Sequence, residues 1–518
     1  MSSKIAKGSA IIMAGNFIFR IGGYVYRFIM AMLLGPASYG ILTTTLQFQG
    51  IFQVLAAGGI PPAIAKYISE YTALDDNALA RQTIYTSLKI MIFLGLLSTL
   101  IIVFWVAPWM ANDFFNKPEA LIPLQAVGLI TPFSVIVGGF RGAFQGVYKM
   151  EYILYTRAVE QICMILFATA LVIIGFSVVG AVFGSAIAFA ASAIVSVFIF
   201  KKYMYKYIPK PENDVKFSIK DELKLGKKII WFSIPVIITA LAEMGIFAIS
   251  TFVLARFLEA RWVGYFGAAD PISRFPLIIS SSIATTILPA TSAAFARKNY
   301  TQLGKYISQS YRYSLLIIIP MCIAIFLFSK PILELVYFTN LDYSTGATAL
   351  GILAIGMGFY SMFAISSGII QGIGNPRIPM YILAGGAILS LVLNWILVPI
   401  WGIEGASIAT TIACFVLMLP IVFLSFKLTK SKFPVKFFLK TLFSGILMGI
   451  IILLLPNTVS GLIYGFIICP IAFLIFLILT KTFSTEDLDV ISSYSTKFGP
   501  LSKIIIKIMN IIKKFYNK

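Results

Sequence analysis

Long apolar stretches separated by short polar connections run along the whole chain. The first stretch, Gly8 to Leu34, exceeds the roughly 20 apolar residues that a helix needs to cross a bilayer. We count fourteen stretches, with centres near Gly22, Gln53, Leu97, Thr131, Leu166, Ala190, Leu241, Ile279, Ile319, Met357, Leu389, Val416, Met448 and Ala472. The pattern predicts an all-α integral membrane protein with fourteen transmembrane helices.

The composition supports this class and removes several kinds of chemistry. Charged residues make up 12% of the chain, whereas soluble domains average about 25%. Histidine is absent, and the four cysteines lie inside apolar stretches without close pairing. We therefore expect no disulfide framework, no metal site, no catalytic residue and no bound cofactor. The chain also lacks a nucleotide-binding motif, so we expect a protein that is not an enzyme.

The net charge of +21 is distributed unevenly between the two sides of the membrane. The connections on the side of the N-terminus carry most of the basic residues, while the opposite connections carry only Lys117, Arg256, Arg261 and Lys330. Basic residues concentrate in cytoplasmic connections. We therefore predict a multi-pass protein of the cell membrane with both termini in the cytoplasm. The basic surplus is then a topology signal that also attracts anionic lipid, and we expect no nucleic-acid partner.

Short motifs recur half a chain apart. The matching pairs are Gly142–Gly146 with Gly368–Gly372 (offset 226), Gly180-Ala181 with Gly405-Ala406 (225), Leu34 and Gly40 with Leu258 and Gly264 (224), and Pro62-Ala63 with Pro289-Ala290 (227). Six stretches separate the copies, so both have the same orientation. Parallel repeats related by an axis along the membrane normal are a transporter architecture, with the substrate between them.

These repeats divide the chain into five parts. We predict an N-terminal six-helix bundle (1–200), a cytoplasmic linker (201–228), a C-terminal six-helix bundle (229–428), two additional transmembrane helices (429–480) and a cytoplasmic tail (481–518). From Leu501 onward the tail alternates apolar and lysine positions, as in an amphipathic helix that lies in the headgroup region.

Four polar residues form a stripe in the first apolar stretch. Asn16, Arg20, Tyr24 and Arg27 are spaced by four, four and three residues, which places them on one side of a helix. A charged side chain at bilayer depth is unfavourable, so it normally faces a protein-lined or water-filled interior. We expect this stripe to bind an anion.

The corresponding part of the second repeat offers one cation and two carboxylates, Arg274, Glu243 and Asp270. Guanidinium groups stay charged and can donate two hydrogen bonds to phosphate, so Arg274 joins the predicted binding site. Structural alternatives remain open. Asp270 and Arg274 are four residues apart and could neutralise each other, and Glu243 could pair with Arg20 or Arg27. Arg27 could also extend to the outer interface.

The Gly-x-x-Gln-Gly motif at Gly142 follows Arg141, at the predicted cytoplasmic edge of the membrane. The simplest interpretation of Arg141 and Arg157 is that they are topology signals. The glycines of the motif could provide a flexible cytoplasmic gate.

Three motifs together resemble a known family. Leu34-Gly-Pro-Ala-Ser-Tyr39-Gly40, Gly59-Ile-Pro-Pro62 and the two Gly-x-x-Gln-Gly copies are similar to polysaccharide-biosynthesis (oligosaccharide) flippases. That family belongs to the multidrug/oligosaccharidyl-lipid/polysaccharide exporter superfamily, and the resemblance is to its stage V sporulation protein B branch. It implies a monomer that flips a polyprenyl-(pyro)phosphate-linked sugar or oligosaccharide across the membrane by alternating access, for cell-surface polysaccharide or glycan assembly.

The resemblance also bears on the site and on the main alternative. Family members have a cationic central cavity, to which Arg20, Arg27 and Arg274 would correspond. Their multidrug-exporting relatives rely on acidic residues in the first and seventh spans, and this chain has only Glu243 in the seventh. The alternative is a cation-coupled multidrug exporter. Glu243 and Asp270 would compete for the arginines or couple transport, and the coupling to protons, sodium or membrane potential is left open.

Overall fold

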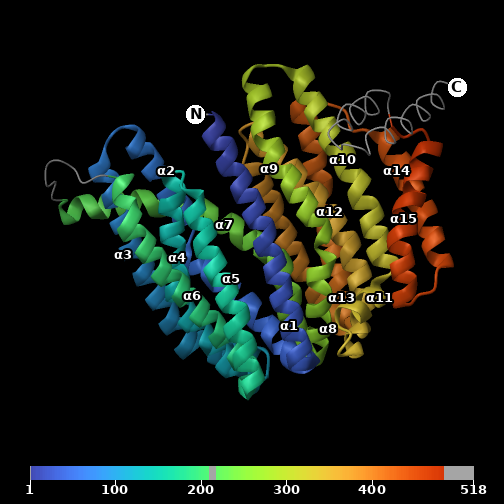
Figure 1. The fold of residues 1–518 in the computed structure, drawn as a ribbon, viewed down its shortest axis with the longest axis horizontal. Coiled ribbons are helices and arrows are strands. Elements are labelled where there is room, and N and C mark those ends of the chain that lie inside the picture. The colour runs from blue at the N-terminus through green and yellow to red at the C-terminus, as the bar shows by residue number, and fades with distance from the viewer. Residues whose placement is uncertain (1, 209–216, 484–518) are drawn as a thin grey trace, which may run out of the picture. The chain divides into compact units, whose positions relative to one another are not determined.

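The computed structural model in Figure 1 describes residues 2–208 and 217–483, without the side chains of residues 2–18, Arg20 and Tyr205. Over these ranges the chain is helical and contains no strand. The α-helices are α1 (Ser2–Ala57), α2 (Ile60–Ala73), α3 (Asn77–Ile101), α4 (Leu121–Gly146), α5 (Met150–Leu171), α6 (Ser177–Tyr203), α7 (Ile219–Phe257), α8 (Ala260–Ser273), α9 (Phe275–Ala296), α10 (Tyr300–Leu327), α11 (Ser329–Val336), α12 (Ala347–Gly372), α13 (Arg377–Thr429), α14 (Val435–Leu454) and α15 (Val459–Leu479). The shorter 3-10 and π-helical elements are η1 (Ile102–Val106), η2 (Trp109–Phe114), η3 (Pro118–Ala120), η4 (Val172–Phe176), η5 (Met204–Lys206) and η6 (Leu341–Gly346).

Eleven helical runs of the described residues are long and apolar enough to cross a membrane. Three of them, Ile21–Ala73, Met150–Tyr203 and Arg377–Thr429, exceed 50 residues and contain a backbone break. In the first, Gly35 has φ 71° and is followed by Pro36, which has no N–H to donate. The all-α membrane architecture is therefore confirmed. The count of fourteen crossings stays a prediction, which requires each of these three runs to cross twice.

The described chain forms two compact units. Unit 1 comprises the chain up to Pro271 together with Val336–Ala349 and Met380–Ala413, and unit 2 comprises the remainder. The second-repeat segments of unit 1 surround the turn after α7, the turn after α11 and the break at Gly402. By the predicted topology all three turns are extracytoplasmic. Unit 1 thus combines the first repeat with the predicted outer ends of the second repeat.

The five predicted parts of the chain are not tested by this division and stay predictions. The middle of the predicted linker and the tail after residue 483, including the amphipathic helix from Leu501, lie outside the described residues.

Residues that the sequence aligned as repeat equivalents make reciprocal contacts in unit 1. A Cβ added to Gly40 of α1 would overlap the carbonyl oxygen of Ala260, and one added to Gly264 of α8 would overlap that of Pro36. Ala260 lies 224 positions after Pro36, the same offset that relates Gly264 to Gly40. A contact in which each helix presents the same two positions to the other is what a local twofold axis produces.

The two Gly-x-x-Gln-Gly copies also pack alike, each within its own unit. In unit 1, Gly142 of α4 lies against Pro61 and Ile64 of α2. In unit 2, Gly368 of α12 lies against Ala284 and Ile287 of α9. A Cβ on either glycine would come within 2.8 Å of a backbone oxygen of the facing helix. The glycines therefore allow close helix packing, and the flexible gate at this motif stays a prediction.

The same contacts correct the register of one predicted repeat match. Pro61 and Ala284 occupy equivalent places, an offset of 223. The match of Pro62-Ala63 with Pro289-Ala290 at 227 was therefore four residues, about one helical turn, out of register.

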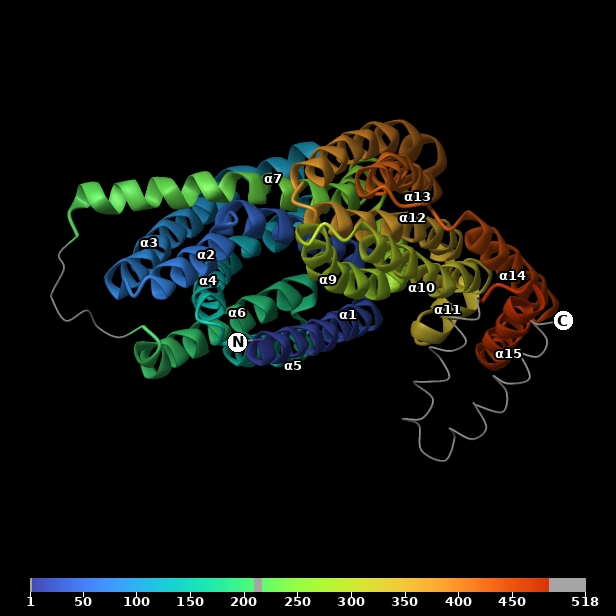
Figure 2. The ribbon, with the colours of Figure 1, turned by 90° about the horizontal axis from the view of Figure 1, so that it is seen from above.

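Within unit 1, α7 extends along helices of the first repeat. It contacts α1, α2 and α3, and Figure 2 shows its N-terminal half beside α2 and α3. Ser218 and Asp221 form a capping box at its start, which satisfies exposed backbone N–H groups. In unit 2, α10 packs against α9 and α14, and α14 packs against α15. Helix α7, the first helix of the second repeat, thus packs against three helices of the first repeat.

Candidate functional site

Arg27 lies on α1 in unit 1, with a half-buried side chain. Its charge acts on the hydroxyl groups of three buried tyrosines, Tyr26, Tyr39 and Tyr337. Among the described residues, no carboxylate forms an ion pair with Arg27. A guanidinium in a membrane helix thus lies near buried phenol groups and forms no direct ion pair, although the charge of Asp270 also acts on Tyr39.

The tyrosines around Arg27 are held firmly by the backbone of neighbouring segments. The hydroxyl of Tyr337 donates to the carbonyl of Ala268 at 3.1 Å, and that of Tyr343 donates to Ala31 at 2.8 Å. The rings of Tyr337 and Tyr343 lie 4.7 Å apart, and Tyr39 meets Tyr343 edge-on at 6.0 Å. Buried tyrosines with satisfied hydroxyls make a rigid wall. We call Tyr39, Tyr337 and Tyr343 the tyrosine shell.

Two further predicted site residues belong to the same region of unit 1. Tyr24 stacks on Phe28 at 6.3 Å, and Phe28 meets Tyr337 edge-on at 5.8 Å. Asp270 of α8 is 5% exposed, and its charge acts on Tyr39. The structure therefore brings Tyr24, Arg27 and Asp270 together around the tyrosine shell, although they come from α1 and α8.

Arg274 lies at the break between α8 and α9 and belongs to unit 2. Helix α8 ends at Ser273, directly before Arg274, and the neutralisation of Asp270 by Arg274 stays a prediction. In unit 2 the charge of Arg274 acts on Cys414 of α13.

The remaining predicted residues lie on α1 and α7. Glu243 is exposed on α7 of unit 1, and it does not pair with Arg27. Asn16 and Arg20 lie on α1, but their side chains are outside the described ones. The convergence of Arg20, Arg27 and Arg274 on one cavity stays a prediction.

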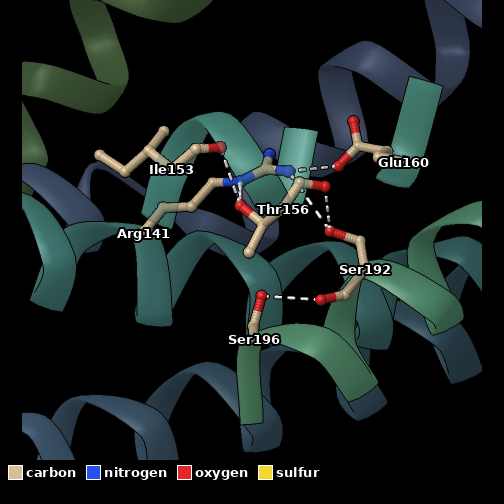
Figure 3. Close-up of polar contacts among 6 residues, drawn as sticks. All are labelled: Arg141, Ile153, Thr156, Glu160, Ser192 and Ser196. Carbon is tan, nitrogen blue, oxygen red and sulfur yellow. Dashed lines mark hydrogen bonds and ion pairs between the residues drawn. The ribbon is translucent and has the colours of Figure 1, made fainter. Parts of the chain in front are cut away.

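A second arginine in unit 1 has a completely different environment (Figure 3). Arg141 of α4 forms a 2.7 Å ion pair with Glu160 of α5 and donates to the hydroxyl of Thr156 at 3.0 Å. It also donates to Ser192 of α6 at 3.3 Å, and Ser192 in turn donates to the carbonyl of Thr156 at 3.0 Å. The side chains of Arg141 and Glu160 are 17% and 21% exposed. We call Arg141, Thr156, Glu160 and Ser192 the Arg141 network.

The Arg141 network shows what the sequence interpretation missed. The sequence predicts Arg141 and Arg157 to be topology signals, whereas in the structure Arg141 ties α4, α5 and α6 together. Arg157 is half-buried, and its guanidinium lies 5.9 Å from the ring centre of Phe19 on α1. Glu160 in the middle of an apolar stretch was the available signal, because a carboxylate at that depth requires a partner.

Two family models match the chain. The family model described as "Polysaccharide biosynthesis protein" matches residues 5–295, more than half of the chain. A second model, MatE, matches residues 235–396.

Two curated relatives from Bacillus subtilis resemble most of the chain. Lipid II flippase MurJ is 24% identical over 450 residues, which cover 80% of this chain and 80% of that protein. Stage V sporulation protein B is 23% identical over 351 residues, which cover 64% of this chain and 66% of that protein.

Two solved structures share the fold. The inward closed conformation of lipid II flippase MurJ matches with a TM-score of 0.72 and 18% identity, covering 90% of this chain and 98% of that one. An inward-facing multidrug resistance MATE family transporter matches with a TM-score of 0.67 and 16% identity, covering 79% and 94%. The chain is thus a multi-pass membrane protein and belongs to the polysaccharide biosynthesis protein family.

Proposed function

We propose that this protein is a monomeric flippase that moves a polyprenyl-(pyro)phosphate-linked sugar or oligosaccharide from the cytoplasmic to the outer leaflet of the cell membrane. Its family membership and its similarity to lipid II flippase MurJ support this proposal. The positive-inside distribution supports an orientation with both termini in the cytoplasm. The protein would act as a transporter and not as an enzyme.

The observation that carries the proposal is the environment of Arg27. Among the described residues it has no carboxylate partner, although it lies in an apolar helix. An arginine at that depth without a direct ion pair is unfavourable unless it binds an anion during function. A pyrophosphate group provides such an anion and accepts the two hydrogen bonds that a guanidinium donates.

The composition of unit 1 fits a state of alternating access. It joins the first repeat to the predicted outer ends of the second repeat, so the two repeats pack together at the predicted extracytoplasmic end. A headgroup would then reach Arg27 from the predicted cytoplasmic side. Rearrangement of the repeats would expose it outward, as in alternating access.

Release requires the cations to give up a multivalent anion. Asp270 already lies near the tyrosine shell, and Glu243 is exposed on α7. We propose that these carboxylates compete for Arg20, Arg27 and Arg274 during release. Their protonation or binding of sodium would then couple transport to an ion gradient. Replacing both by their amides should make flipping insensitive to an imposed proton or sodium gradient.

The proposal is tested in liposomes that contain the purified protein and a fluorescent polyprenyl-phosphosugar in the inner or outer leaflet. Wild-type protein should transfer the lipid between leaflets, and Arg27→Ala should not. The matched control is Arg377→Ala, because Arg377 is an exposed arginine at the start of α13. Equal transfer by the Arg27 variant and wild type would refute the proposal.

A cation-coupled exporter of amphipathic drugs is the second candidate. The MatE match over residues 235–396 and the likeness to a multidrug transporter structure favour it. A drug exporter would depend on Glu243 and would tolerate loss of Arg20 and Arg27. Measuring drug efflux and glycolipid flipping with the same variants separates the two functions.

A further inference from the structure

Two cations bind the backbone of each other's segment where the first repeat meets α7. Lys117 follows η2 in the connection between α3 and α4, and Arg256 lies in the last turn of α7. Both belong to unit 1 and to connections that the charge distribution predicts to be extracytoplasmic. They therefore lie at the end of the molecule where unit 1 joins the two repeats.

Lys117 caps the C-terminus of α7. Its Nζ donates to the carbonyl oxygens of Ala255 and Leu258, at 2.6 Å each. The last carbonyl groups of a helix lack partners within the helix and carry the negative end of its dipole. An ammonium group at this position satisfies two of them and is favoured by the dipole.

Arg256 makes the reverse contact. Its guanidinium donates to the carbonyl oxygens of Phe114 at 2.8 Å and Asp113 at 3.4 Å, which are the last two residues of η2. Two residues before Lys117, the ring of buried Phe115 lies 6.1 Å from that of Phe252 on α7. Each segment therefore satisfies the carbonyl groups of the other around an aromatic contact.

We propose that Lys117 and Arg256 form a reciprocal latch that holds the outer end of the transporter closed and that must separate before a headgroup can leave on that side. The inference rests on the proposed alternating access. In a flippase the closed and open outer ends must be close in free energy, and four hydrogen bonds to backbone oxygens are a contact that can be broken and remade. Both cations bind main-chain oxygens at the ends of α7 and η2. The latch therefore forms only when these two helix ends lie next to each other.

Other cations on the same predicted face provide matched controls. Lys330 pairs within its own helix with Glu334 at 3.9 Å, and Arg261 pairs with nearby Glu259 at 2.6 Å. Neither pair connects the two repeats, so loss of either should leave the outer end unchanged.

The latch is tested by distance measurement between spin labels on the two segments. The labels are attached at Asn112→Cys and at Trp262→Cys, shortly after the end of α7, both exposed positions, in a chain whose four natural cysteines are replaced. Wild-type protein in vesicles should give a short distance. Lys117→Met and Arg256→Met should each add a longer component of at least a third of the population, whereas Lys330→Met and Arg261→Met should not.

Lys117→Arg separates the latch from a general loss of structure, because it keeps a donor that reaches two carbonyl groups. It should restore the short distance, and the melting temperature of all variants in micelles verifies that they are folded. Unchanged distances in folded Lys117→Met and Arg256→Met would overturn the latch. Because the measurement uses no substrate, this outcome is distinct from a failure of glycolipid flipping.

Discussion

Arg27 and Arg141 are both arginines of apolar helices in unit 1, but the protein treats their charges in opposite ways. Arg141 is neutralised by Glu160 and donates to the hydroxyls of Thr156 and Ser192. The charge of Arg27 acts on the hydroxyls of buried tyrosines, and no carboxylate of the described chain forms an ion pair with it. A cation paired with a carboxylate joins helices, whereas a cation without an ion pair can attract an anionic ligand. The comparison separates structural from functional arginines in this protein.

The largest effect should come from breaking the Arg141 network. Arg141→Ala leaves the Glu160 carboxylate without its partner, which typically destabilises by about 3–5 kcal/mol. The free energy of unfolding, measured by denaturant titration in micelles, should fall by this amount.

The matched control replaces both partners. Arg141→Met with Glu160→Met removes the two charges together and should recover most of the lost stability, because no uncompensated charge remains. If Arg141→Ala were as stable as wild type, the structural role of the Arg141 network would be wrong.

Arg27→Ala should weaken substrate binding without lowering the free energy of unfolding, the reverse of Arg141→Ala. Loss of a hydrogen bond to a charged group removes about 1.5–3 kcal/mol of binding, which corresponds to a decrease of about 10- to 100-fold. The apparent affinity for a polyprenyl-phosphosugar should fall by this factor in the flipping assay, while the stability stays the same or rises.

Arg27→Lys sharpens this expectation. It keeps the charge but not the two-pronged geometry, so its affinity should lie between those of wild type and Arg27→Ala. A stability loss for Arg27→Ala as large as that for Arg141→Ala would erase the distinction between the two arginines.

Gly142 tests whether the Arg141 network depends on close helix packing. A Cβ at this position would lie 2.6 Å from the carbonyl oxygen of Pro61, so Gly142→Val must push α4 away from α2. Overpacking of this kind typically costs about 1–3 kcal/mol. The unfolding titration should show this loss.

Gly385→Ala is the control, since nothing lies within 4 Å of a Cβ there. It should be neutral or slightly stabilising, because alanine favours helices more than glycine. Equal effects of the two substitutions would contradict the packing role of the Gly-x-x-Gln-Gly motif.

Lys117 adds a third way of holding a cation, by backbone carbonyl groups, and gives the smallest expected effect. Burial lowers the pKa of the Lys117 ammonium to about 8, while the charges of Glu119 and Glu259 act in the opposite direction. Three other charged residues belong to the surroundings of Lys117. Arg256 donates to the carbonyl of Asp113, and Arg261 forms an ion pair with Glu259. In an open, hydrated state the pKa would be near the usual value of about 10.4.

The sign of the pH effect follows from these two values. The open state binds more protons between about pH 8 and pH 10.4, so raising the pH through this window favours the closed latch. The uncharged amine still has two N–H donors for the two carbonyl groups. The long-distance fraction in the spin-label experiment should therefore fall as pH rises. Lys117→Arg stays charged over this range, so its long-distance fraction should not change with pH. A long-distance fraction that rises with pH in the wild type would contradict this account of Lys117.

The sequence was most informative where the physics is local. Hydropathy predicted the apolar helices, because it depends on residues close together in the chain. The break of α1 at Gly35 falls where the first apolar stretch ends. The equivalence of Gly40 and Gly264 was also visible, and their contact explains why both are glycine.

The sequence was less informative where partners come from distant segments. The tyrosine shell joins Tyr39 to Tyr337 and Tyr343, about three hundred positions later in the chain, which no local pattern reveals. The pairing of Arg141 with Glu160 depends on how α4 meets α5. Small differences in helix packing decided these features.

The central claim is that Arg27 binds the phosphate of a lipid-linked sugar, and a substrate charge series tests it most directly. The affinities of wild type and Arg27→Gln are measured for the same fluorescent polyprenyl sugar with a neutral, a monophosphate and a diphosphate linkage. We predict that wild type favours the diphosphate over the neutral lipid by at least tenfold and that Arg27→Gln loses most of this preference. An equal charge preference in both proteins would contradict the account.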